Sequence, residues 1–300
     1  PDVPIYCTAN AVKSLKGQYG GEGWNFVTVK SGDKLDVGNG RELVFLEMRM
    51  LHWPDSMACF LTGDNILFSN DAFGQHYAAE NLFDDLSDMD AVLRECVIYY
   101  ANILSPFSRM LKRKLDEVVS LNLPIEMIAP SHGVIWRNDT TTIVELYSKW
   151  CDGYSEDKIA IVYDSMWEGT EKLAMDLASR IGGLSPDTEV ALCHLQHMPK
   201  NEIMAHVFES RAVALGSPTV VNDMMSSMGG FLHYLRELKF SGKKGCAFGC
   251  YGWSGESPAK IREGLDAAGF EVLEAEVRCN WNPAKEDEEA LDALAKALVS

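Results

Sequence analysis

Three side chains in the first half of the sequence are of types that bind transition metals, and each follows an apolar stretch typical of a strand. His52 comes after RELVFLEM, Asp71 comes directly after NILFSN, and His132 comes after EMIAP. Imidazole nitrogens together with a carboxylate suit a metal such as iron, and the two oxygens of one carboxylate can bridge two metals. Taken singly, each residue also fits an ordinary polar position in a turn, since histidine is commonly half-buried without a ligand.

The stretch DSMWEGTE, residues 164–171, has the composition of a phosphate-binding loop. It carries hydroxyl groups at Ser165 and Thr170, and Gly169 lies where the next helix is expected to begin. Backbone N–H groups and the positive end of a helix can hold a phosphate there, with the hydroxyls as further donors. The loop lacks the G-K-[ST] sequence of a Walker A site, which argues against a nucleoside triphosphate.

Two more loops in the second half could cover an aromatic ring. They are GSPTVVND, residues 216–223, and GCYGWSGES, residues 249–257. Small residues let the backbone approach a ligand closely, and Tyr251 and Trp253 supply aromatic surface. Each loop alone is more often a plain turn. One loop suited to a phosphate, together with two loops that could cover an aromatic ring, predicts a pocket for flavin mononucleotide (FMN). The residues expected to bind FMN are Ser165, Met166, Trp167, Gly169, Thr170, Ser217, Pro218, Thr219, Asn222, Tyr251, Gly252, Trp253, Ser254 and Gly255.

The elements that would position these three loops alternate regularly between strand and helix. KIAIVYD, EVALCHL, RAVALGS, KGCAFGC and EVLEAEV read as strands, and each is followed by a stretch with helical apolar spacing. Five consecutive βα units require a parallel sheet with right-handed crossovers and helices on both faces. The prediction is a doubly wound five-stranded domain that binds its ligand beyond the carboxyl ends of the strands, where the winding reverses.

The first half reads as several strands followed by helices. PIYCTA, WNFVTVK, RELVFLEM, ACFLTG and NILFSND are the expected strands, and MDAVLRECVIYYANIL, SRMLKRKLDEVVSLN and TTIVELYSKW the expected helices, with EMIAP as a short buried strand between the last two. The polar stretch CDGYSEDK then marks a domain boundary. We therefore expect one domain over residues 1–154 and a second over residues 155–300.

Composition limits the classes of function. The chain has 300 residues, of which 47% are hydrophobic, enough for two domains with cores of their own. A net charge of −17 opposes binding to nucleic acid or to an anionic membrane surface. No apolar run could span a bilayer and the N-terminus does not resemble a signal peptide, so we expect a cytoplasmic protein. Eight cysteines without a C-x-x-C pair fit reduced thiols.

The second half resembles flavodoxin, and the chain as a whole resembles the flavodiiron proteins. The matching stretches are MLHWPDSM, LFSNDAFGQHY, SHGVIWR, YDSMW and GWSGES. The resemblance implies a metallo-β-lactamase-like αββα domain, followed by a flavodoxin-like domain. It also implies an oxidoreductase that reduces O₂ to water, NO to N₂O, or both, at two non-haem irons with electrons relayed through FMN.

The resemblance also assigns roles to the three metal-binding candidates. His52 would ligate one iron, Asp71 would bridge, and His132 would ligate the other, whereas His76 would lie behind the ligands or serve a structural role. The H-x-E-x-D-H motif that supplies most remaining ligands in this family is missing from the sequence. We therefore expect the chain to hold a partial metal domain, as a fragment of a longer protein, although a shortened homologue without a working diiron site is an alternative.

Partners follow from the same resemblance. A head-to-tail homodimer, or a tetramer built from two such dimers, would bring the FMN of one copy to the irons of the other. The sequence ends without a Cys-rich extension, which leads us to expect an external electron donor such as rubredoxin. The basic run RMLKRK, residues 109–114, could dock that donor but is more typical of a solvated helix face.

Two other functions are compatible with the residues. The chain could be an FMN electron-transfer module whose metal domain is non-functional, which would bind FMN and no iron. It could also be a zinc hydrolase of the β-lactamase-like class, since the same histidine and carboxylate donors suit zinc. Neither the choice between O₂ and NO nor the electron donor follows from the residue types.

Overall fold

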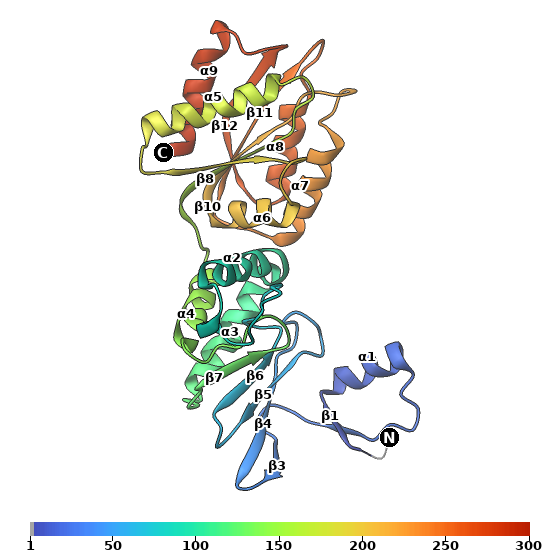
Figure 1. Ribbon diagram of the computed structural model, residues 1–300. Coiled ribbons are helices and arrows are strands. Elements are labelled where there is room, and N and C mark those ends of the chain that lie inside the picture. Colours follow the sequence, from blue (N-terminus) through green and yellow to red (C-terminus); the bar gives the residue numbers. More distant parts are fainter. Residues whose placement is uncertain (1–2) are drawn as a thin grey trace. The chain divides into compact units, whose positions relative to one another are not determined.

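The computed structural model describes residues 3–300 as two compact units, which meet between Asp152 and Gly153 (Figure 1). This division falls two residues before the boundary expected from the polar stretch of the sequence. None of the helices in residues 3–300 is long and apolar enough to cross a bilayer.

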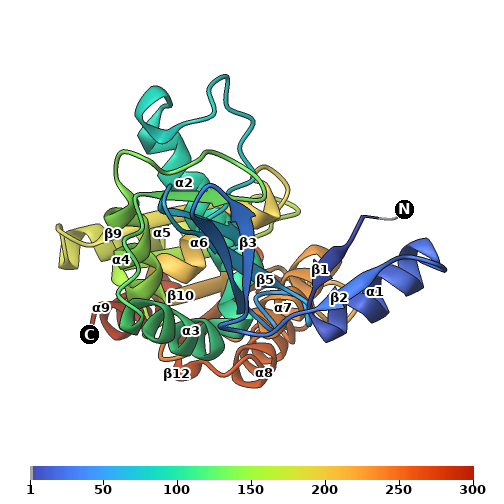
Figure 2. The same cartoon turned by 90° about the horizontal axis from the view of Figure 1, so that it is seen from below.

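The first unit contains seven strands and four α-helices among its described residues. These are β1 (Ile5–Cys7), α1 (Ala9–Tyr19), β2 (Phe26–Thr28), β3 (Lys34–Gly38), β4 (Arg41–Glu47), β5 (Met57–Leu61), β6 (Ile66–Asn70), α2 (Met89–Tyr99), α3 (Ser108–Ser120), β7 (Met127–Pro130) and α4 (Thr140–Trp150). A π-helical turn over Tyr100–Leu104 continues α2. Both ribbon views place α1, β1 and β2 beside the main sheet, away from α3 and α4 (Figures 1 and 2).

The main sheet of this unit has the order β3-β4-β5-β6-β7. Neighbouring strands are antiparallel except for β6 and β7, which are parallel. Therefore β4, β6 and β7 all run in one direction and end at one edge of the sheet. His52, Asp71 and His132 follow these three strands, so the topology brings them to the same edge.

One face of this sheet packs on helices. Ala58, Phe60 and Leu67 are buried on that face, and Leu115 of α3 and Val144 of α4 line a cavity with Ala58 and Leu67. Beyond the sheet, an aromatic cluster fills the space between the helices. Its rings belong to Tyr100, Tyr147 and Trp150, with centroids 5.1 to 5.5 Å apart.

Two elements of the first unit were missed by the sequence prediction. Helix α1 begins directly after the first strand, where the Thr8 hydroxyl accepts a hydrogen bond from the Ala11 N–H and caps the helix. Strand β3 pairs with β4 through Asn39 and Gly40, both with positive φ. An Asn-Gly pair of this conformation is the preferred turn of a tight hairpin, and it places β3 beside β4.

The second unit contains five strands and five α-helices. These are β8 (Glu156–Tyr163), α5 (Gly169–Leu184), β9 (Glu189–His194), α6 (Lys200–Glu209), β10 (Ser210–Gly216), α7 (Ser226–Leu238), β11 (Lys244–Tyr251), α8 (Ser257–Ala267), β12 (Glu271–Asn280) and α9 (Glu288–Val299). The strands form one parallel sheet of order β12-β11-β10-β8-β9. The predicted doubly wound five-stranded sheet is confirmed, and the winding reverses between β8 and β10.

Both faces of this sheet are covered. Alternate residues of the strands, such as Ile159, Ile161 and Phe248, pack with Leu177 of α5 and Leu294 of α9. Figure 1 shows α6, α7 and α8 on the other face. Because both faces are buried, the strands read as continuous apolar runs, and the loops that follow them are free to carry polar, functional residues.

Candidate functional site

The edge of the first sheet holds a carboxylate between two imidazoles. Asp71 Oδ2 lies 3.5 Å from His52 Nε2, and Asp71 Oδ1 lies 4.0 Å from His132 Nε2. Two ligands of one metal, each about 2 Å from it, are roughly 3 to 4 Å apart. The geometry therefore fits a carboxylate whose two oxygens serve two different metals, one beside each histidine.

These three side chains line a cavity of about 690 Å³, together with Ser14 and Gln18 of α1. His76 and Tyr99 also line it, and their rings contact the His132 ring, with centroid distances of 5.1 and 5.0 Å. Burial, and to a lesser degree the charge of Asp71, raises the pKa of the Tyr99 phenol. Tyr99 therefore stays a neutral hydroxyl, and His76 forms part of the wall behind the His132 ring.

The donor set in this cavity is incomplete. Within residues 3–300, no group of three or more His, Cys, Asp or Glu side chains has the arrangement of a complete metal site. His52, Asp71 and His132 supply two nitrogens and two oxygens, which are the donor types that non-haem iron takes. The residues present thus fit part of a two-metal centre.

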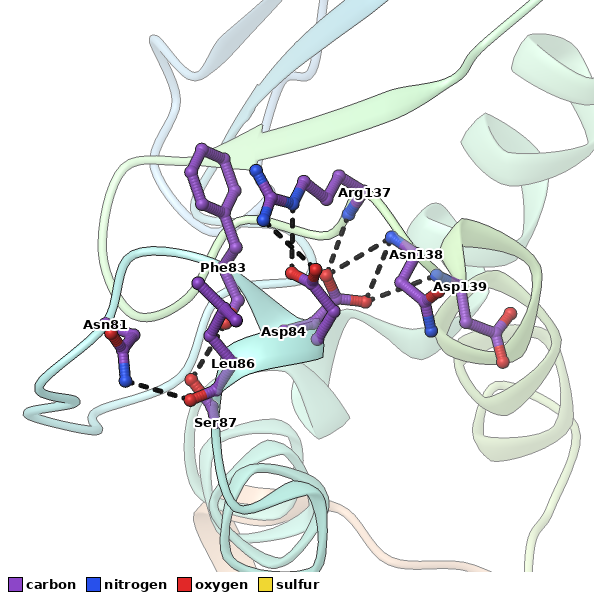
Figure 3. A network of polar contacts seen from close by, with 9 residues as sticks. Asn81, Phe83, Asp84, Leu86, Ser87, Arg137, Asn138 and Asp139 are labelled. Atoms are coloured by element: carbon purple, nitrogen blue, oxygen red, sulfur yellow. Dashed lines mark hydrogen bonds and ion pairs between the residues drawn. The ribbon is translucent and has the colours of Figure 1, made fainter.

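A buried carboxylate holds the chain segment that follows His132. The Asp84 side chain accepts hydrogen bonds from the backbone N–H groups of Arg137, Asn138 and Asp139. Arg137 in turn pairs with Asp85 through two hydrogen bonds of 2.9 and 3.0 Å and lies over the Phe83 ring (Figure 3). This network joins the loop before α2 to the segment after β7.

The second unit has a cavity of about 370 Å³ beyond the carboxyl ends of β8, β10, β11 and β12. Ten of the fourteen residues predicted to bind FMN line it: Ser165, Met166, Trp167, Gly169, Thr170, Pro218, Thr219, Tyr251, Gly252 and Trp253. The cavity lies where the winding reverses, which is where this architecture binds its ligands.

Two hydroxyls in this cavity are buried without a strong hydrogen-bond partner. Ser165 Oγ has no partner in the described chain 3–300, and Thr170 Oγ1 lies beside the Cys250 thiol, a weak acceptor, although water cannot reach either hydroxyl. Such groups are costly unless a ligand satisfies them. Both lie at the N-terminal end of α5, the position that favours an anion, so the residues fit the phosphate of FMN.

Gly169 is required at this position by the space around it. A Cβ there would lie 2.6 Å from the Trp281 carbonyl oxygen and 3.1 Å from Cys250 Sγ. The loop after β8 therefore packs directly on the ends of β11 and β12.

Four predicted FMN residues lie outside the cavity lining: Ser217, Asn222, Ser254 and Gly255. Ser217 is fully buried, and its hydroxyl accepts a hydrogen bond from the Met225 N–H. Asn222 has a positive φ beside the bridge between Val220 and Asp223. Ser217 and Asn222 thus shape the loop after β10. They were predicted to contact the ligand because small and turn-forming residues are common in ligand-binding loops, but here they form the turn itself.

Five residues that line the cavity were missed by the sequence prediction: Val220, Val221, Cys250, Trp281 and Asn282. Trp281 is the largest of them. A Cβ on Gly252 would lie 2.7 Å from the Trp281 ring, so the indole lies flat on this glycine. The only signal available in the sequence was the position of Trp281 directly after the last strand.

The basic run of residues 109–114 lies on α3, and its two lysines are ion-paired. Lys114 Nζ lies 2.6 Å from a Glu117 oxygen, and Lys112 Nζ lies 3.6 Å from an Asp116 oxygen. These pairs within one helix are typical of a solvated face.

Comparison with known families follows the division into two units. Residues 5–133 match the model of the ODP family of β-lactamases, and residues 161–293 match the flavodoxin model. The predicted fold class, a β-lactamase-like domain followed by a flavodoxin-like domain, is confirmed.

Curated relatives include the anaerobic nitric oxide reductase flavorubredoxins of Escherichia coli O1:K1 and Shigella flexneri. Each is 47% identical over 292 residues, which cover 97% of this chain and 60% of the relative. The chain thus spans about 60% of the length of these relatives.

Solved structures of similar fold cover almost the whole chain. The rubredoxin oxygen:oxidoreductase of Desulfovibrio gigas is 33% identical with a TM-score of 0.94, and the match covers 99% of this chain and 74% of that one. The flavodiiron protein of Giardia intestinalis is 34% identical with a TM-score of 0.92, covering 98% and 72%. Because almost the whole chain matches these relatives and carries both a flavodoxin-like and a β-lactamase-like domain, it belongs to the flavodiiron proteins, whose cofactors are FMN and a non-haem diiron centre.

Proposed function

We propose that this chain is part of a flavodiiron oxidoreductase that reduces dioxygen to water, nitric oxide to nitrous oxide, or both. The observation that carries the proposal is the position of Asp71, whose two oxygens each face a different histidine at 3.5 and 4.0 Å. A single carboxylate shared in this way suits two metals held side by side. A scaffold without a metal function would have no need of this arrangement.

The roles of the three side chains follow from their atoms. His52 and one Asp71 oxygen would hold the first iron, and His132 and the other oxygen the second. Once bound, the two irons supply the binding and reduction of the diatomic gas, and FMN supplies electrons one at a time. The protein contributes the spacing of the ligands and a cavity whose wall carries the neutral Tyr99 hydroxyl.

The flavin would be held at both ends of its cavity. Ser165, Thr170 and the first turn of α5 would bind the phosphate, because two hydroxyls and free helix N–H groups meet there. Tyr251 and Trp253 would lie against the ring system. The small Gly252 lets the backbone of this loop come close to the ligand.

We further infer that the flavin cavity faces another protein surface. Its rim carries Trp167, Trp253 and Trp281, which are 81%, 75% and 63% exposed, and the exposed Val221. Apolar rims of this size mark interaction sites. In keeping with the family, we propose a head-to-tail homodimer or a tetramer of such dimers, with rubredoxin or a similar protein as electron donor.

The test uses the full-length protein that contains this chain. Metal and flavin content are measured, followed by consumption of O₂ and, under anaerobic conditions, conversion of NO to N₂O with a chemical reductant. Iron and FMN with either gas activity support the proposal. FMN without iron would instead indicate an electron-transfer module, and zinc without flavin would indicate a hydrolase; both would refute it.

A further inference from the structure

His132 is held in one orientation by the segment that follows Asp71. Its Nδ1 lies 3.1 Å from the backbone carbonyl oxygen of Gln75. A carbonyl can only accept a hydrogen bond, so Nδ1 must carry the hydrogen and Nε2 must be the nitrogen with the free lone pair. That nitrogen is the one beside Asp71.

The Gln75 side chain fixes this carbonyl in place. The side chain is fully buried; its Nε2 donates to the Phe73 carbonyl at 3.1 Å, and its Oε1 accepts from the Val134 N–H at 2.8 Å. These partners settle which end of the amide is oxygen. Gln75 thus spans the two chain segments that carry Asp71 and His132, with one polar atom bonded to each.

Two glycines make the close fit possible. A Cβ on Gly133 would lie 1.9 Å from Gln75 Oε1, and a Cβ on Gly74 would lie 2.7 Å from the His132 ring. Phe73, the acceptor for the amide, is itself held by the Tyr147 hydroxyl, which accepts from its N–H at 3.0 Å, and by the Trp136 indole N–H, which donates to its carbonyl at 2.9 Å. The support behind His132 therefore continues into the core.

His52 has no comparable support. In the described part of the chain its one polar contact is with Asp71, and its one aromatic contact is with Trp53. The two histidines are therefore unequally prepared for a metal. One has a fixed ring and a fixed tautomer, and the other is free to adjust.

We propose that Gln75 is a positioning residue that locks His132 in the Nδ1–H tautomer and so prepares Nε2 as a metal ligand before any metal binds. This inference rests on the proposed diiron function for its purpose, but the tautomer itself can be measured without metal. Groups that orient metal-binding histidines in this way typically change metal affinity about 10- to 100-fold when they are removed.

The experiment is a long-range ¹H–¹⁵N correlation spectrum of histidine-labelled, metal-free protein at a pH where the imidazoles are neutral. The His132 signals are assigned by their loss in His132→Gln. We expect His132 to be a single tautomer with the hydrogen on Nδ1 in the wild type and a mixture of both tautomers in Gln75→Met. Gln18→Met, which makes the same substitution elsewhere in the metal cavity, should leave the tautomer unchanged.

Iron binding gives the second measurement. Anaerobic titration with Fe²⁺ alone should show affinity about 10- to 100-fold weaker in Gln75→Met. Gln75→Glu keeps an acceptor for the Val134 N–H but loses the N–H donor to the Phe73 carbonyl, so we expect a mixture of both tautomers in this variant as well. It also decides the matter if Gln75→Met fails to fold, because a fully mixed tautomer in folded Gln75→Glu supports the lock and a wild-type spectrum contradicts it.

A hydrogen on Nε2 of His132 in the wild type would overturn the proposal, as would an unchanged tautomer and iron affinity in Gln75→Met. Failure of the proposed function would look different. In that case His132→Gln would bind as much iron as the wild type, whatever the tautomer of the native ring.

Discussion

The poorly satisfied hydroxyl of Thr170 leads to two expected effects of opposite sign, one on stability and one on FMN binding. Thr170 is 1% exposed, and its Oγ1 has no stronger partner in residues 3–300 than the neighbouring Cys250 thiol, which is a weak acceptor. Thr170→Val keeps the shape of the side chain and replaces the hydroxyl by a methyl group. We expect this change to stabilise the flavin-free protein and to weaken FMN binding.

The magnitudes follow from the burial of this hydroxyl. An unsatisfied buried polar group costs about 1 to 3 kcal/mol, and the substitution removes that cost from the flavin-free state. A hydrogen bond to a charged group such as a phosphate contributes about 1.5 to 3 kcal/mol. Its loss corresponds to roughly a 12- to 140-fold increase in the dissociation constant of FMN, at 1.4 kcal/mol for each factor of ten.

The assays are calorimetric titration of flavin-free protein with FMN and thermal unfolding of the same preparation. The control is Thr188→Val, at the amino end of β9, where the hydroxyl donates to Asp157 and is therefore satisfied. That variant should lose stability and keep its FMN affinity. Should Thr170→Val bind FMN as tightly as the wild type, or unfold at a lower temperature without flavin, the assignment of this hydroxyl to the phosphate is wrong.

Four further changes probe other parts of the molecule. Asp71→Ala removes the carboxylate that faces both histidines, so iron content and gas reduction should fall while FMN content stays the same, as metal analysis and absorbance will show. Trp281→Ala removes the ring that lies on Gly252 and should weaken FMN binding without changing iron content, which calorimetry and metal analysis can separate. Asp84→Ala leaves three backbone N–H groups without their acceptor, at about 1 to 3 kcal/mol each, and denaturant unfolding should show a loss of at least ~3 kcal/mol. Burial lowers the pKa of Lys243 from 10.5 to about 7. Between these pH values the unfolded chain binds more protons than the folded one, so the free energy of unfolding should rise with pH across that window. The rise should be smaller in Lys243→Met, and an identical slope in both proteins would contradict the shifted pKa.

The flavin-binding unit could be predicted well from the sequence because its pattern is simple. Strands buried on both faces read as apolar runs such as KIAIVYD, and the parallel topology places every following loop at one edge of the sheet. Ser165, Thr170, Tyr251 and Trp253 were found in this way, and all four line the cavity. Trp281 was missed because its role comes from a contact in space with Gly252, 29 positions earlier in the sequence.

The metal-binding unit was harder to predict from its residues. His52, Asp71 and His132 could be named, but their meeting at one edge depends on the common direction of β4, β6 and β7. That direction depends on strand pairings that local sequence does not contain. The part played by Gln75 gave no signal, since a lone glutamine in a mixed stretch is usually at the surface, and here it is fully buried.

The exposed indoles around the flavin cavity give the protein an optical property. Trp167, Trp253 and Trp281 contact solvent, as does Trp53 of the first unit, whereas Trp136 and Trp150 of the first unit are buried in apolar surroundings. Water shifts indole emission to longer wavelength, so the two groups of tryptophans emit at different ends of one band. A bound isoalloxazine absorbs light that nearby indoles emit, and it will quench the long-wavelength part most strongly. One unlabelled fluorescence spectrum can thus follow flavin loading at its red edge and the integrity of the metal-binding unit at its blue edge.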